Sequence, residues 1–145
     1  MGQIYKVYCP DCGHSFEFSQ GCGRFDCTAV GRERHKQKIL TGAFGEEPKK
    51  ILDKHPDALI SYSKELLYCD KCNRYENRSV YRIYKKAQSE GSNVLLFVLE
   101  YDCIKCHQPM EVIGGRDSEY FAKPFTLACP RCKSPARISA VLCFD

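Results

Sequence analysis

The sequence lacks long apolar runs, and it contains no tryptophan and only two methionines. Its longest apolar run, Val94 to Leu99, is much shorter than the roughly 20 residues that a helix needs to cross a bilayer. The first residues, MGQIYKVYCPDC, contain no apolar segment followed by a cleavage site, so they do not resemble a signal peptide. We therefore expect a cytoplasmic protein in a reducing compartment, with no membrane partner.

Cysteine, in contrast, is abundant. Eight of the 11 cysteines form four Cys-x-x-Cys pairs, and we call the turn at each pair a knuckle. The pairs are Cys9/Cys12, Cys69/Cys72, Cys103/Cys106 and Cys129/Cys132. Eight thiolates are the right number for two tetrahedral Cys₄ sites, and soft thiolate ligands of this kind select zinc, with iron as the second choice. We predict two structural Zn²⁺ ions held by these eight residues.

Two other uses of paired cysteines are disulfides and redox chemistry. Disulfides belong to secreted chains, and a thioredoxin-like pair needs a cysteine at a helix N-terminus. Here a proline follows Cys9 and Cys129, and strand-forming residues flank each pair, which is typical of a metal-binding turn between two strands. No nucleophile stands with a spaced histidine and acid, and four intact pairs leave no open metal position for a water, so we expect no enzyme activity.

The net charge does not indicate a polyanionic partner. The formal charge is +4 with every cysteine counted as neutral. Each Zn²⁺ with four thiolates would carry two negative charges, so two such sites would bring the metal-bound protein close to neutrality.

The predicted fold is a small metal-stabilised α+β structure, made mostly of β-hairpin zinc ribbons with a helical insert after the first knuckle. The insert covers residues from about 28 to 55, with one helix over Thr28 to Leu40 and a second that begins at Pro48 and ends before Pro56. Val94 to Tyr101 is apolar on both alternating faces, which predicts a central strand that leads into a hairpin at the third knuckle.

A polar loop at residues 88–93 suggests two units, residues 1–92 and 93–145, which could still pack as one. Sequential pairing of the knuckles, the first with the second and the third with the fourth, is the favoured expectation. Nested pairing, the first with the fourth and the second with the third, remains open, because a hairpin can contribute to a metal site from anywhere in the chain.

Several segments resemble a group of small bacterial zinc-ribbon proteins with four cysteine pairs. They are Cys9-Pro-Asp-Cys12-Gly-His-Ser-Phe-Glu-Phe with Gly21-x-Gly23, Gly45-Glu-Glu, His55-Pro-Asp-Ala58 and Leu67-Tyr-Cys69-Asp-Lys-Cys72. The resemblance spans nearly the whole chain and implies a bacterial, cytosolic zinc-binding protein without an assigned activity. The chain departs from the group in Cys22, Cys27 and Cys143, and in Asn73 and His107, where a glycine commonly follows the knuckle.

The leading functional hypothesis is an adaptor that docks onto an unidentified protein partner. The alternative is a module for single-stranded nucleic acid, in which Arg74, Arg78 and Arg82 share one face of a strand with Tyr84. The alternative to solvent-facing arginines is pairing with Glu76 and neighbouring acids.

Cys22 and Cys27 suggest a third hypothesis. We expect them to be small buried residues or free thiols, although they could oxidise reversibly as a redox sensor or join His14 or His35 in a third metal site. Cys143 is expected in the core, and His35 and His55 in solvent.

Overall fold

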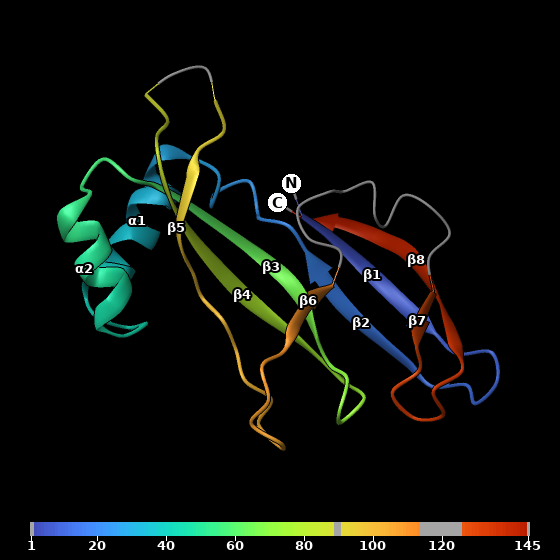
Figure 1. Cartoon of the computed structure of the whole chain (residues 1–145). Helices are drawn as coiled ribbons and strands as arrows, with labels where there is room; N and C mark the ends of the chain where they lie inside the picture. Colours follow the sequence, from blue (N-terminus) through green and yellow to red (C-terminus); the bar gives the residue numbers. More distant parts are fainter. Residues whose placement is uncertain (1, 89–90, 114–125, 145) are drawn as a thin grey trace.

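The computed structural model describes residues 2–88, 91–113 and 126–144, and strands dominate it (Figure 1). Its strands are β1 (Gly2–Tyr8), β2 (Ser15–Gln20), β3 (Leu59–Cys69), β4 (Arg74–Lys85), β5 (Val94–Val98), β6 (Glu111–Ile113), β7 (Thr126–Ala128) and β8 (Pro135–Phe144). Its helices are α1 (Ala29–Leu40) and α2 (Glu46–Lys54). The predicted α+β class is therefore wrong: the described chain is mostly β, with two antiparallel sheets and two short helices.

The first sheet joins the two ends of the chain. Its strand order is β2-β1-β8-β7, and every pair is antiparallel. Gly2 of β1 lies opposite Phe144 of β8, so the termini lie side by side (Figure 1). β2 is an edge strand of this sheet, as is the short β7.

The second sheet is built from the middle of the chain, in the order β5-β4-β3-β6. Its centre is the long β3–β4 hairpin, which pairs without interruption from Leu59 opposite Tyr84 to Cys69 opposite Arg74. The second knuckle is the turn of this hairpin. In Figure 1 the knuckle turns lie at the lower end of both sheets, and the helices lie beside the second sheet at its far end.

A shared core holds the two sheets together. Tyr5, Val7 and Phe18 of the first sheet pack with Leu66 of β3, and all four side chains are buried. Beyond the end of β2, the backbones of Gly21 and Lys64 exchange two hydrogen bonds of 2.9 and 2.7 Å, which join the two sheets at one point.

The helices form a second, smaller core over β3 and β4. Ile39 of α1 and Leu52 of α2 are buried against Tyr81 and Ile83 of β4. Thr28 caps α1 by accepting a hydrogen bond of 3.0 Å from the Gly31 amide, which agrees with the predicted helix start. α2 begins at Glu46, two positions before Pro48. No helix in the described part of the chain is long and apolar enough to cross a membrane.

The expectation of a central strand before the third knuckle is wrong, and the hairpin expected at this knuckle is confirmed only next to its turn. The segment predicted as a central strand forms β5, which is a sheet edge with Val94 and Leu95 exposed. The third knuckle is the tip of a short hairpin-like turn, closed by an antiparallel bridge between Asp102 and Pro109. The strands beyond it do not extend this pairing, because β5 pairs with β4 whereas β6 pairs with β3.

The two sheets do not follow the boundary expected between residues 92 and 93, since each contains strands from both sides of it. Residues 89 and 90 of the polar loop lie outside the described residues. A division of the chain into two folding units stays a prediction.

Candidate metal centres

The structure brings the eight paired cysteines into two groups of four. The first centre is Cys9, Cys12, Cys129 and Cys132, and the second is Cys69, Cys72, Cys103 and Cys106. Within each group all Sγ atoms lie within 4.8 Å of one another. The chain therefore has two Cys₄ groups that can each hold a metal ion, which gives it a structural metal-binding role.

The sulfur–sulfur distances suit a tetrahedral ion. Zn–S bonds of about 2.3 Å place the sulfurs of a tetrahedral site roughly 3.8 Å apart. In the first centre Cys9 lies 3.5 Å from Cys132, and Cys12 lies 3.6 Å from Cys129. In the second centre Cys69 lies 3.5 Å from Cys106. These three distances would need to widen by only a few tenths of an ångström for the sulfurs to surround Zn²⁺.

The pairing of the knuckles is nested. The first knuckle meets the fourth and the second meets the third, so the favoured sequential pairing is wrong. The reason is the strand order: β1 pairs with β8, which brings both ends of the chain and their knuckles to one place. The first centre thus closes the chain between its termini, and the second closes a loop within it.

All four knuckles share the same backbone turn. In three of them the amide four residues after the first cysteine donates to that cysteine's carbonyl, as Gly13 does to Cys9 at 2.9 Å. The residue directly after the second cysteine has a positive φ in every knuckle: Gly13 (75°), Asn73 (49°), His107 (59°) and Lys133 (64°). The absence of glycine at Asn73 and His107 therefore changes the side chain but not the turn.

Backbone amides around the sulfurs favour one thiolate in each centre. Hydrogen bonds from the amides of Cys106 and Lys105 lower the pKa of Cys103 to about 6. In the first centre the hydroxyl and amide of Ser134 lower the pKa of Cys132 to about 6. These donors spread the negative charge that a metal-bound sulfur retains.

Another thiol in each centre keeps its proton more strongly. The His14 amide lowers the pKa of Cys12, but burial and the neighbouring thiols outweigh it and raise this pKa to about 12. In the second centre a hydrogen bond with Cys106, together with burial, raises the pKa of Cys72 to about 12. A metal ion therefore has to displace protons from both centres when it binds.

Asn73 connects the two centres. It belongs to the second centre's knuckle, yet its side-chain amide donates at 3.0 Å to the carbonyl of Cys129, a ligand of the first centre. Its carbonyl oxygen accepts from the Tyr68 hydroxyl at 2.9 Å. Tyr75 adds a hydrogen bond of 2.9 Å to the carbonyl of Ala128. Sequence reasoning treated Asn73 only as a departure from glycine and missed this connection.

The three arginines of the nucleic-acid hypothesis are all paired with acids. Arg74 and Arg78 both contact the carboxylate of Glu76, at 3.3 and 2.9 Å. Arg82 forms a bidentate ion pair with Glu65, at 2.5 and 2.9 Å, and Glu65 is 1% exposed. The hydrogen bonds with Glu65 raise the pKa of Arg82. Because Arg82 is bound by a buried carboxylate, only Arg74 and Arg78 of the three arginines remain near the surface.

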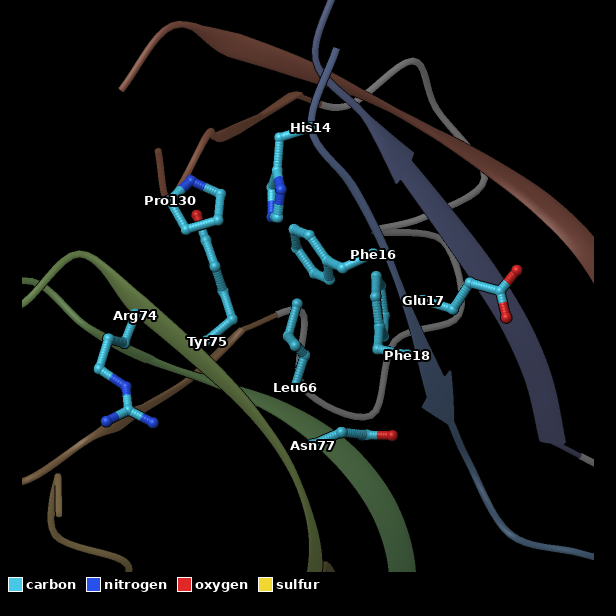
Figure 2. A pocket seen from close by; sticks show the side chains of 9 residues that line it. All are labelled: His14, Phe16, Glu17, Phe18, Leu66, Arg74, Tyr75, Asn77 and Pro130. Atoms are coloured by element: carbon cyan, nitrogen blue, oxygen red, sulfur yellow. The ribbon is translucent and has the colours of Figure 1, made fainter. Parts of the chain in front are cut away.

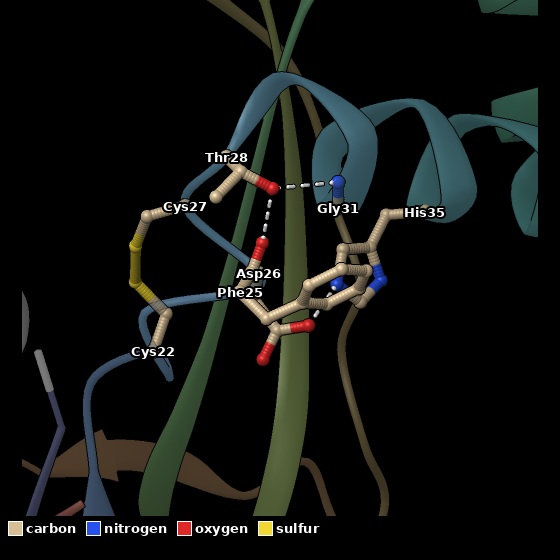
Figure 3. The surroundings of a disulfide bond; sticks show 7 residues. All are labelled: Cys22, Phe25, Asp26, Cys27, Thr28, Gly31 and His35. Atoms are coloured by element: carbon tan, nitrogen blue, oxygen red, sulfur yellow. Dashed lines mark hydrogen bonds and ion pairs between the residues drawn. A yellow bond between two sulfur atoms is a disulfide. The ribbon is translucent and has the colours of Figure 1, made fainter. Parts of the chain in front are cut away.

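The remaining cysteines also differ from expectation. Cys22 and Cys27 are joined by a disulfide just before α1 (Figure 3), so their sulfurs are bonded to each other and are not free thiols. Cys143 is exposed and not part of the core. His35 is not in solvent: it lies between Asp26 (2.8 Å) and the Tyr81 hydroxyl (3.1 Å), with only 12% of its side chain exposed.

Comparisons with protein families, with curated proteins and with solved structures find no match for this chain. The resemblance to small bacterial zinc-ribbon proteins therefore stays an expectation, and the two Cys₄ groups carry the functional argument by themselves.

Proposed function

We propose that the chain is a structural zinc protein that acts as a protein-interaction adaptor and not as an enzyme. The observation that supports this most directly is the nested pair of Cys₄ groups, whose sulfur spacing suits tetrahedral Zn²⁺. Each group draws its four ligands from two knuckles that are distant in sequence, so a bound ion would cross-link the fold.

A structural role for the ions follows from the ligand set. Four thiolates complete a tetrahedral shell, and a catalytic zinc keeps one position for water or substrate. Zinc is favoured over iron here only by the general preference of structural Cys₄ sites in ribbon-like turns. The ions would stabilise a surface, and recognition would come from the strands and turns that they hold in place.

Metal analysis of the purified chain tests the first half of the proposal. We expect two zinc ions per chain, falling to about one in a Cys12→Ser variant and in a Cys72→Ser variant. Well under two metal ions in the parent protein, or iron in place of zinc, would contradict the proposal.

Affinity purification with and without nuclease tests the adaptor half. Protein partners that stay bound after nuclease treatment are the expected result. Recovery that depends on intact nucleic acid would instead support the single-strand binding alternative.

A further inference from the structure

The outer edge of β2 carries backbone groups that point away from the first sheet. Residues alternate along a strand, and those of one parity pair with β1 while the others face outward. The outward groups of Gly21 bond to the Lys64 backbone, and those of Ser19 bond at 2.8 Å to both ends of the Asn77 side-chain amide. Asn77 thus takes the place of a neighbouring strand at that position.

The same alternation directs the backbone N–H and C=O of Glu17, and then of Ser15, out of the same edge. Among the residues that the structure describes, none forms a hydrogen bond with these groups. Unpaired edge groups of this kind are a template for an additional strand. The protein therefore covers one end of the β2 edge with its own residues and leaves the knuckle end open.

A cleft of about 320 Å³ lies against this open segment. The side chains of Phe16 and Phe18 of β2, and of His14 just before it, line the cleft opposite the strand that carries Tyr75, with Leu66 and Pro130 also on the wall (Figure 2). Phe16 and Tyr75 stack at 5.4 Å, and the His14 ring lies 6.2 Å from Phe16. The walls therefore offer ring faces and edges, which suit a large apolar or aromatic group.

We propose that the open edge of β2 binds an extended segment of a partner protein as an added antiparallel strand, with one large apolar or aromatic side chain of that segment in the cleft. This rests on the adaptor role proposed above and names the chemistry of the partner. A residue opposite Glu17 would exchange two backbone hydrogen bonds with it. The residues on either side would then project onto the face that carries Phe16, where the cleft is.

The charges around the cleft favour a peptide over a nucleic acid. The Glu17 carboxylate has no ion pair among the described residues, so it favours a basic side chain opposite it in the added strand. Arg74, the basic group of the lining, is already engaged by Glu76. A metal-bound first centre, next to His14 and Pro130, would add negative charge, which disfavours phosphates.

The test is selection from a random linear peptide display library against the metal-loaded, full-length chain. We expect the enriched peptides to share a large apolar or aromatic residue directly next to a basic one. An enriched peptide added to ¹⁵N-labelled protein should shift the amide signals of Ser15 to Phe18 and of Tyr75. Oligothymidylate serves as the second probe in the same titration.

Glu17→Pro is the decisive variant. Proline is tolerated on an edge strand where the N–H faces outward, and it removes the Glu17 donor that the added strand would use. We expect about tenfold weaker peptide binding, as for one lost hydrogen bond. Glu17→Ala, which keeps the N–H, is the matched control and should retain binding, apart from a smaller loss for peptides with the basic residue.

Failure of this inference is distinguishable from failure of the proposed function. A chain with two zinc ions that enriches no peptide, or that binds peptides equally well as Glu17→Pro, overturns the site and leaves the structural zinc role intact. Oligothymidylate that shifts the same amides more strongly than the peptides overturns the site as a peptide site. A chain without zinc contradicts the proposed function itself.

Discussion

At the scale of single residues, the positive φ after each knuckle gives the clearest prediction. Lys133 is exposed and adopts φ 64°, a conformation that suits glycine better than a residue with a Cβ atom. Lys133→Gly should therefore raise the free energy of unfolding of the metal-bound protein by about 0.5 to 1 kcal/mol. Chemical denaturation in the presence of zinc measures this.

Asn73 is the matched position with the opposite expected result. It shares the left-handed conformation, but its buried side chain bonds to the Cys129 carbonyl and the Tyr68 hydroxyl. Asn73→Gly relieves the same strain and loses both bonds, so we expect a net loss of about 1 to 2 kcal/mol. Equal stabilisation by both glycines would show that the Asn73 connection contributes nothing.

The ligands could be predicted from the sequence because a Cys-x-x-Cys turn is local and its two sulfurs converge whatever surrounds it. The fate of Arg82 could not be predicted. Its place on β4 is readable from the alternation, but its partner Glu65 is on β3, and only the register of the hairpin brings them together. The cleft on β2 had a readable signal, the alternating rings of His14, Phe16 and Phe18, which sequence reasoning did not use.

At the scale of elements, the Glu65–Arg82 pair predicts how the β3–β4 hairpin responds to substitution. Arg82→Leu leaves a buried carboxylate without its partner, and we expect a loss of about 3 to 5 kcal/mol in the free energy of unfolding. Replacing Glu65 by leucine as well should recover much of this loss. Arg78→Ala is the control at an exposed arginine on the same strand, whose partner Glu76 keeps its contact with Arg74, and it should change stability by less than about 1 kcal/mol.

In helix α1, we expect a glycine-to-alanine substitution to destabilise the protein instead of stabilising it. Glycine to alanine inside a helix usually stabilises it by about 1 kcal/mol. Gly31 is buried against the loop that the Cys22–Cys27 disulfide closes, and a Cβ atom there would collide with the carbonyl oxygen of Phe25. Gly31→Ala should therefore lower the melting temperature, which a thermal melt monitored by circular dichroism would detect. A higher melting temperature in this variant would show that the loop around Phe25 can shift to accommodate the Cβ atom without destabilising the protein.

The elements themselves were only partly predictable. The start of α1 is specified locally by Thr28, which caps it, and sequence reasoning found it. The edge position of β5 could not be predicted, because apolar residues on both faces indicate that a strand is buried but not whether strands or helices cover it. Here the helices cover one part of the strand, as Leu96 and Phe97 pack in their core, while Val94 and Leu95 remain exposed at the sheet edge.

At the scale of the whole molecule, the nested pairing means that the two metal centres cross-link different parts of the fold. The first centre ties the β1–β2 turn to the β7–β8 turn, and those strands pair extensively with one another. The second centre ties the stable β3–β4 hairpin to the third knuckle. That knuckle leads into β6, whose three residues pair only with Leu66, Leu67 and Tyr68. The sequence could not reveal this difference, because a tetrahedral site joins two turns irrespective of their separation along the chain.

Loss of each metal should therefore loosen a different part of the protein. In Cys72→Ser, hydrogen exchange should accelerate in residues 99–113, since structural zinc supplies on the order of 10 kcal/mol and the third knuckle has little strand pairing to replace it. In Cys12→Ser, the acceleration should fall on the first sheet, near its knuckles. The long β3–β4 hairpin should stay protected in both variants. Acceleration over the whole chain in either one would mean that the two centres stabilise a single cooperative unit, with Asn73 as the contact that couples them.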